Sequence, residues 1–163
     1  MHHLKRREEI VFAAEYGSNS EGFGRSVLVD GSNGSVHMGL GLCRLDDGHV
    51  EEHVHSFEES FYVLEGMPTL YLDGRGVVLL PGACGVVPVG VPHAWRLDDG
   101  VATWIEMAAP QPRPRGNGQP DTYFAGGPPS SPPSELDVRD PRNRNLFRLD
   151  DWQMDVDELK LGA

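Results

Sequence analysis

Two histidines separated by a single residue, His53 and His55, constrain this chain more than any other feature of its sequence. In a β-strand, residues i and i+2 lie on the same face, so the two imidazoles lie side by side, roughly 6.6 Å apart at the backbone. Glu59 follows four residues later, and a straight strand would carry it out of reach. We therefore expect residues 56–58 to bend the chain, so that Glu59 opens the next strand beside the histidines. His93 is the remaining good candidate for a third nitrogen ligand.

Three imidazoles and one carboxylate form a ligand set that suits a divalent transition metal. The candidates are Mn, Fe, Co, Ni, Cu and Zn. The alternative is that His53, His55, Glu59 and His93 are ordinary buried polar residues. Burying an unpaired carboxylate costs several kcal/mol, so four such groups sharing one interior favour metal binding. The ligands alone do not choose among the metals. Glu59 is also the candidate catalytic residue, because a carboxylate ligand can detach and act as a base.

Two stretches of the chain resemble the two sequence motifs of the cupin superfamily. The first motif has a glycine, H-x-H, a glutamate and a second glycine, and these positions hold Gly48, His53, His55, Glu59 and Gly66. The second has a glycine, P-x-G and a histidine, and these positions hold Gly82, Pro88, Gly90 and His93. The chain departs from the family pattern twice. One residue fewer than usual precedes His53, and Leu97 stands where an asparagine is common.

The resemblance covers roughly residues 39–107 and implies a cupin double-stranded β-helix, a jelly-roll barrel with a metal inside it. It does not imply one reaction. A metal-dependent enzyme on a small polar molecule is the leading hypothesis, with a dioxygenase slightly preferred over a lyase, an isomerase or an aminohydrolase like the ureidoglycine-processing cupins. The alternative is a non-catalytic cupin that binds a metal or a small molecule. Residues 140–142 resemble a linker of two-cupin proteins, so this chain could be one half of such a protein.

The distribution of turn residues predicts an all-β domain. The 163 residues include 20 glycines and 13 prolines, which indicates many turns rather than long helices. We expect a flexible N-terminus over residues 1–9 and a barrel of eight to ten short strands over residues 10–108. Within it, residues 16–24 should form a loop and residues 46–48 a turn. Asp73-Gly74 is a strong hairpin signal.

The composition changes after the barrel, where eight of the thirteen prolines lie between Pro110 and Pro133. Such a segment cannot join a sheet interior and favours extended chain. We expect an arm over residues 109–149 that packs on its own barrel or on a neighbour's. A short helix should follow over residues 150–163, with Asp150 as its N-cap.

Strand parity selects four pocket-lining candidates that share a face with a predicted ligand: Phe61, Val63, Trp95 and Glu51. Glu51 is also a candidate hydrogen-bond acceptor for a ligating histidine. Arg44 and Arg96 are the nearest basic residues to the motifs, and neither points clearly inward. An anionic substrate would therefore have to bind the metal itself. Cys43 and Cys84 are expected to be buried and to behave as small hydrophobes.

The net charge of −11 argues against nucleic acid as a partner, because phosphate binding needs a clustered basic face. No apolar stretch is as long as the about 20 residues that a helix needs to cross a bilayer. The N-terminus lacks the apolar core of a signal peptide. Two cysteines do not form a disulfide framework. We therefore expect a cytoplasmic protein whose partner is a small-molecule substrate or ligand. A homodimer through edge strands or the arm is also expected.

Overall fold

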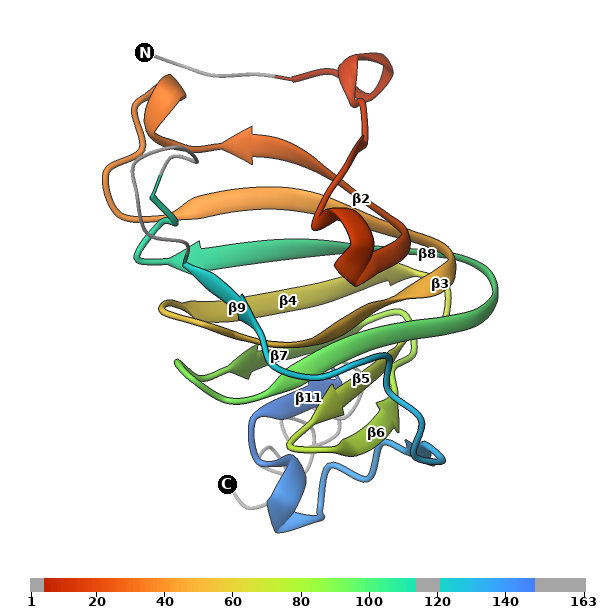
Figure 1. Ribbon diagram of the computed structural model, residues 1–163. Helices are drawn as coiled ribbons and strands as arrows, with labels where there is room; N and C mark the ends of the chain where they lie inside the picture. Colours follow the sequence, from red (N-terminus) through yellow and green to blue (C-terminus); the bar gives the residue numbers. More distant parts are fainter. Residues whose placement is uncertain (1–4, 114–120, 149–163) are drawn as a thin grey trace, which may run out of the picture.

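The computed structural model describes residues 5–113 and 121–148, whose regular structure is almost all β-strand (Figure 1). Eleven strands form one sheet with the order β1-β2-β3-β8-β4-β7-β11, to which β5, β6, β9 and β10 are joined as branches. The helical segments of the described residues are four 3-10 turns of three residues each. The prediction of an all-β jelly roll is confirmed. The helix predicted over residues 150–163 lies outside the described residues.

The strands differ greatly in length. They are β1 (Ala13–Ala14), β2 (Ser20–Val29), β3 (Gly39–His55), β4 (Glu58–Glu65), β5 (Thr69–Leu72), β6 (Arg75–Val78), β7 (Ala83–Val87), β8 (His93–Ala109), β9 (Thr122–Phe124), β10 (Ser134–Glu135) and β11 (Leu146–Arg148). The 3-10 turns are η1 (Arg7–Glu9), η2 (Gly17–Asn19), η3 (Gly31–Asn33) and η4 (Pro141–Asn143). Two strands, β3 and β8, have 17 residues each, which is far longer than the short strands expected from the sequence.

The two long strands hold the barrel together. They pair antiparallel from Gly39↔Ala108 to His53↔His93. The first part of β8 also pairs with β5, whereas its second part pairs with β4. Each wall of the barrel therefore contains part of the same strand pair, and the walls are joined by continuous backbone.

The predicted turn at residues 46–48 is wrong, because β3 continues through it as a bulge. The register with β8 shifts between Asp46 and Gly48, and Asp47 takes a positive φ of 40°. A Cβ on Gly48 would lie 2.1 Å from the carbonyl oxygen of Glu21 on β2, so only glycine fits this close approach. Aspartate and glycine favour a bulge as readily as a turn, and the sequence pattern does not separate the two.

Two other local predictions have different outcomes. The hairpin at Asp73-Gly74 is confirmed, with positive φ at both residues (50° and 75°) between β5 and β6. The loop predicted over residues 16–24 is shorter, because η2 occupies residues 17–19 and β2 already begins at Ser20. Of the predicted flexible N-terminus, residues 5–9 are described, and the Lys5 ammonium donates to the Val27 carbonyl oxygen at 3.2 Å.

The barrel interior is polar at one end and apolar further in. Along β4 the inward residue Glu59 is followed by Phe61, and along β8 His93 is followed by Trp95. Phe61 meets Trp95 edge to face at 5.2 Å, and Trp95 stacks on Trp104 at 4.5 Å. These apolar side chains are at most 2 % exposed, so they form the packed floor beneath the histidines.

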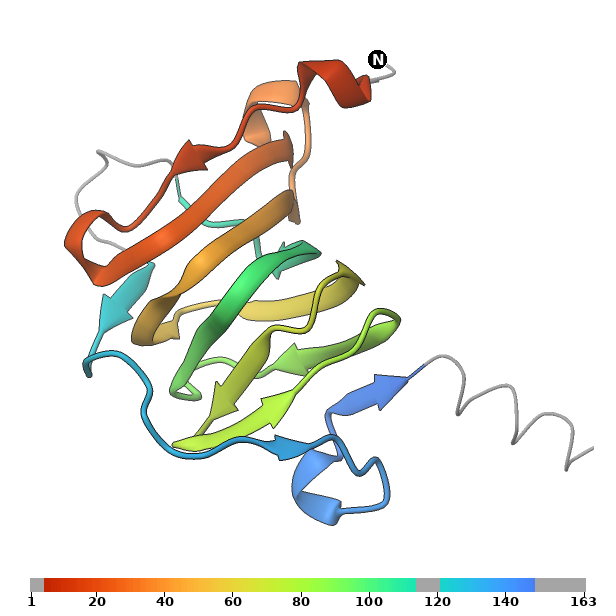
Figure 2. The same ribbon diagram turned by 90° about the vertical axis from the view of Figure 1, so that its right-hand side faces the viewer.

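The described part of the arm, residues 121–148, runs along the outside of its own barrel (Figure 2). They contribute three short edge strands: β9 pairs with β3, β10 with β6, and β11 with β7. Leu146 on β11 enters the core and is 1 % exposed. The proline-rich arm is therefore excluded from the sheet interior, as expected, and is bound to the barrel edges over its described length.

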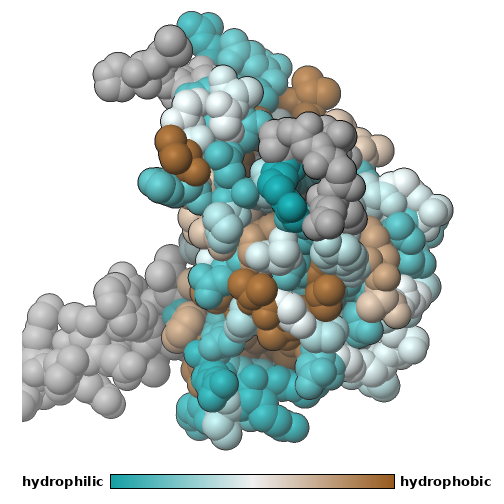
Figure 3. Space-filling model, turned by 60° about the vertical axis from the view of Figure 1, so that its left-hand side comes forward, coloured by the Kyte–Doolittle hydropathy of each residue, from teal (hydrophilic) through white to brown (hydrophobic). Residues whose placement is uncertain are grey.

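The face shown in Figure 3 is mainly polar, with small separate apolar patches rather than one extended apolar surface. This agrees with the net charge of −11. None of the helical segments in the described ranges has the length or the apolar character needed to cross a membrane.

Candidate metal centre

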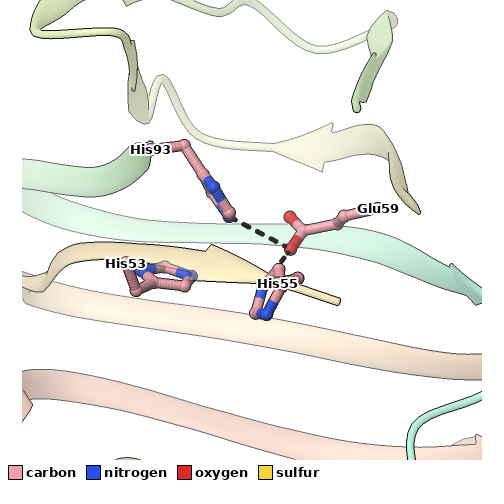
Figure 4. Close-up of side chains that lie close together, drawn as sticks. All are labelled: His53, His55, Glu59 and His93. Carbon is pink, nitrogen blue, oxygen red and sulfur yellow. Dashed lines mark hydrogen bonds and ion pairs between the residues drawn. The ribbon is translucent and has the colours of Figure 1, made fainter. Parts of the chain in front are cut away.

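The structure brings the four predicted ligands together. His53 and His55 lie at the end of β3, Glu59 at the start of β4 and His93 at the start of β8, and the side chains point toward one another (Figure 4). One ligand atom from each lies within 4.8 Å of the others. Every one of these residues is at most 4 % exposed. The bend predicted over residues 56–58 is confirmed at residues 56 and 57, and β4 begins one residue earlier than expected, at Glu58.

The atoms at the centre of the cluster fit a metal ion. The Nε2–H group of His55 donates to Glu59 Oε2 at 3.0 Å, but Glu59 Oε1 and His93 Nε2 are buried without a hydrogen-bond partner among the described residues. Buried polar atoms are normally satisfied, so these two require a reason. A divalent ion about 2.1 Å from each ligand needs ligand atoms about 3–4.2 Å apart. The widest separation in the cluster, up to 4.8 Å, exceeds this range by about 0.6 Å, so the cluster would need to contract by that much to bind one.

The outer ring nitrogens of two histidines are held by main-chain carbonyls. The Nδ1–H groups of His53 and His93 donate to the carbonyl oxygens of Glu51 (2.7 Å) and Val91 (3.0 Å). This fixes the tautomer in which Nε2 carries the lone pair that a metal binds. His93 Nε2 then faces Glu59 Oε2 at 3.4 Å. Two lone pairs repel at this distance unless a proton or a metal ion lies between them.

The pKa values of His53, Glu59 and His93 are shifted by burial and by the contacts among these residues. Burial, followed by repulsion from His93 and His55, lowers the pKa of His53 to about 3, so this imidazole is neutral at neutral pH. Burial alone would raise the pKa of Glu59, but its contacts with His55 and His93 outweigh burial and hold that pKa well below its ordinary value. Burial opposes charge on His93 as well, yet the contact with Glu59 raises its pKa. The cluster therefore presents a charged carboxylate to whatever cation lies within it.

His55 is supported from the arm, which the sequence did not indicate. Its Nδ1 lies 3.0 Å from the hydroxyl oxygen of Thr122 on β9, 67 residues away in the chain. A hydroxyl can donate or accept. Thr122 therefore suits both the tautomer that donates from Nε2 to Glu59 and the one that binds a metal through Nε2. No motif marks this threonine, since its position depends on the pairing His55↔Thr122.

The predicted role of Glu51 needs correction. Its main-chain carbonyl, rather than its carboxylate, accepts from His53. The register between β3 and β8 shifts between Val50 and His53, and both of these residues are buried. Parity counted back from His53 through this bulge therefore gives the wrong face for Glu51.

Three aromatic rings cover the histidines, and we call them the aromatic cover: Tyr16, Phe57 and Phe124. Phe57 stacks on His55 at 4.3 Å. Tyr16 and Phe124 lie 5.8 and 5.3 Å from His53 and 5.2 Å from each other. Tyr16 has a φ of 67°, an uncommon conformation for an aromatic residue. The cover comes from the N-terminal segment, the bend and the arm, and it explains why the ligands are so little exposed.

The other predicted pocket residues lie in the core. Phe61, Val63 and Trp95 are at most 2 % exposed and belong to the main apolar cluster. They form the floor below the histidines and pack against other side chains.

One cation that points into the barrel is Arg25, which the sequence reasoning missed. Its Nη2 lies 2.7 Å from Glu106 Oε1 inside the barrel. The two basic residues considered from the sequence, Arg44 and Arg96, pair instead with aspartates close by on the exposed side of the sheet. Arg25 was overlooked because the predicted loop over residues 16–24 concealed the alternation of β2, in which Phe23 and Arg25 share a face. Cys43 is also more than a small hydrophobe, since its thiol donates to Glu106 Oε2 at 3.2 Å.

Part of the barrel matches a known protein family. Residues 41–107 match the family model described as "Cupin domain". Among curated proteins, the quercetin 2,3-dioxygenase of Bacillus subtilis (strain 168) is 34% identical over 62 residues. The match covers 37% of this chain and 18% of that protein, so the chain spans less than a fifth of this relative's length.

Solved structures give the same fold at low sequence identity. The polyketide cyclase RemF from Streptomyces resistomycificus has a TM-score of 0.63 and 23% identity, over 67% of this chain and 80% of that one. A cupin-2 domain from Rhodospirillum rubrum has a TM-score of 0.58 and 16% identity, over 76% and 80%. An RmlC-like cupin from Shewanella frigidimarina has a TM-score of 0.57 and 22% identity, over 72% and 96%.

Proposed function

The barrel of this chain is a cupin domain, and from this premise we propose that the chain is a metal-dependent enzyme acting on a small polar molecule. The observation that carries the proposal is the pair of buried atoms Glu59 Oε1 and His93 Nε2 at the centre of the cluster, neither of which has a hydrogen-bond partner among the described residues. A structural role for these residues would leave Glu59 Oε1 desolvated without compensation, and His93 Nε2 with only its 3.4 Å contact to Glu59 Oε2. A bound divalent transition metal would satisfy them together.

The bound metal would supply a Lewis acid with a coordination position open to substrate. The chain's own residues orient and protect that position. His53, His55 and His93 present Nε2 because their Nδ1 atoms are held from outside. Glu59 is the proposed base, since one of its oxygens has no hydrogen-bond partner in the part of the chain that the structure describes. The aromatic cover limits the access of water.

Among reaction types we favour a dioxygenase slightly. The similarity to quercetin 2,3-dioxygenase supports this preference, and it extends over 62 residues. A lyase, an isomerase and an aminohydrolase are the alternative reactions.

The test begins with metal analysis of the full chain purified without a histidine tag. One equivalent of metal is expected in the native protein and much less in His53→Ala and His93→Ala. His37→Ala is the matched control, because His37 is exposed and lies outside the cluster. Oxygen uptake and metal-dependent turnover on small acids and phenols then test catalysis. Equal metal content in all four proteins would overturn the proposal.

A non-catalytic metal or small-molecule binder is the second candidate. The closed cover favours it, because a site whose ligands are at most 4 % exposed retains an ion well but admits a substrate poorly. Stoichiometric metal without turnover, together with undiminished biological activity of His93→Ala, would favour this alternative. The expected homodimer and cytoplasmic location stay predictions, and light scattering on the purified chain tests the first.

A further inference from the structure

The wall of the barrel that ends at β11 carries a row of apolar side chains on its outer surface. On each strand of this wall the inward side chains are buried in the core, so the residues that alternate with them face outward. The strand register places one outward residue of each strand beside the next, from β11 through β7, β4 and β8 to β3. We call these five residues the outer row: Phe147, Cys84, Tyr62, Ile105 and Leu42.

The described part of the chain leaves this row partly open to solvent. Phe147 is 54% exposed, and the other four residues of the outer row are half-buried. A second outward row lies beside it, with a single polar member: Val86, Ser60, Met107 and Leu40. A sheet face that water covers normally presents polar side chains, whereas a contiguous apolar face marks a contact with another apolar surface.

The chain continues after β11 through residues 149–163, which lie outside the described residues. The sequence predicts a helix over residues 150–163, in which Trp152, Val156 and Leu159 occupy positions i, i+4 and i+7. We call these three residues the apolar stripe, because that spacing places them on one face of a helix. A helix of this length gains most of its stability from packing such a stripe against other apolar side chains. The stripe therefore requires an apolar surface within reach.

The outer row matches the expected helix in position and in length. Phe147, at one end of the row, is followed in β11 only by Arg148, after which the segment begins. The row crosses five strands spaced about 4.8 Å apart and is therefore about 19 Å long. A helix over residues 150–163 is about 21 Å long at 1.5 Å per residue. A helix that turns back at the end of β11 can thus cover the row within one chain.

We propose that residues 150–163 form a helix that docks on the outer row of its own barrel, with the apolar stripe against the sheet. The docked helix lies behind β4, whose inward face carries Glu59, and it docks whether or not a metal is bound. Docking within the chain is favoured over a second copy because the segment is tethered beside the row, which gives it a high effective concentration there.

Cys84 is a natural probe of this face, because it lies in the outer row and its thiol is half-buried in the described structure. Cys43 faces the barrel interior and is 0% exposed, so a thiol reagent added to the folded protein reports on Cys84. The rate of this reaction in the full-length native chain measures how well the face is covered.

The test compares two double variants of the full chain. Trp152→Ser/Leu159→Ser removes two residues of the apolar stripe, and the reaction of Cys84 should become at least about 10-fold faster than in the native protein. Met154→Ser/Leu161→Ser is the matched control, because these two apolar residues lie on the opposite face of the expected helix. Its reaction rate should equal that of the native protein.

The outcomes distinguish the occupants of the face. Equal rates in the native protein and both variants would overturn the proposal. Protection that is lost on dilution of the native protein would show that a second copy covers the row, which also overturns it. Protection that is independent of concentration, and lost only in the stripe variant, is the expected result. These rates require no bound metal, so their failure leaves the proposed function standing.

A second measurement approaches the contact from the barrel. Trp95 and Trp104 are at most 2% exposed, so acrylamide quenching of fluorescence reports mainly on Trp152. Ile105→Lys places a charge at the outer row and should make Trp152 more accessible to the quencher. Val89→Lys is the control, because Val89 is 55% exposed and precedes β8 in a loop. Unchanged quenching in Ile105→Lys would contradict docking at this face.

Discussion

The barrel and the arm contribute to the same site in different ways. The barrel supplies all four candidate ligands from the ends of three strands, within two short motifs. The arm supplies Thr122 and Phe124, which lie against His55 and His53 because three residue pairs align β9 with β3. The candidate ligands are thus specified by two short stretches of sequence. The contacts that Thr122 and Phe124 make with the histidines depend instead on the register between β9 and β3. Perturbing each region should therefore have distinct consequences.

Loss of the metal should have the largest effect, and it acts through the barrel. Removing the ion with a chelator, or substituting His93→Ala, should abolish a stabilisation of about 4 kcal/mol at a metal concentration 1,000 times Kd. This corresponds to a fall in Tm of roughly 8–16 °C for a chain of this size. Scanning calorimetry with and without chelator measures it. If the chelator leaves the Tm of a metal-loaded sample unchanged, the metal bound by the barrel residues does not stabilise the fold, and the prediction is wrong.

Acid should destabilise the metal-free barrel next most strongly. The pKa of His53 is about 3 in the folded protein, and an unfolded histidine has a pKa of about 6.5. The folded state binds fewer protons in this window, so its stability is greatest above pH 6.5 and falls as the pH decreases toward 3. Glu59 acts in the same direction through its lowered pKa, whereas the raised pKa of His93 stabilises the acid side and partly offsets the loss.

We expect a net loss of about 1–3 kcal/mol between pH 6.5 and pH 4.5 in the metal-free protein. Urea midpoints across this range measure it. His53→Asn carries no titrating ring at this position, so its midpoint should vary less with pH. An equally steep dependence in that variant would show that His53 is not the responsible group.

Thr122→Val tests the arm's support of the site. The valine keeps the shape of the side chain but loses the hydroxyl that contacts His55 Nδ1, and metal affinity should fall about 10- to 100-fold. Tyr123→Val on the same strand is the matched control, because Tyr123 is 46% exposed. Competition with a coloured chelator gives both affinities. Equal losses in the two variants would mean that β9 acts only as an edge strand.

Phe124→Ala should have the smallest effect on stability and a selective effect on access. Phe124 is half-buried, so the loss should be about 1–2 kcal/mol, below the 3–5 kcal/mol typical of a fully buried phenylalanine. Opening the aromatic cover should speed the release of metal to a chelator severalfold. Phe147→Ala, an exposed phenylalanine on β11, is the control. Identical release rates would show that the arm does not close the site.

The comparison also explains what the sequence predicts well. The four candidate ligands and the hairpin at Asp73-Gly74 depend on residues close in sequence, where strand parity and turn chemistry act directly. Glu51 was misplaced because a single extra residue in a bulge reverses parity. Thr122 could not be found at all, since nothing within the proline-rich arm specifies which strand it pairs with. Arg25 was concealed by an error in where β2 begins.

The glycine at position 41 makes residues on neighbouring strands dependent on each other. A methyl group there would occupy the path that the Arg25 side chain follows to Glu106. Gly41→Ala should therefore act as a remote substitution of Arg25, leaving its charge in the chain while moving it out of place. Among related barrels we expect positions 41 and 25 to change together: a chain with a residue larger than glycine at position 41 should lack the arginine at position 25.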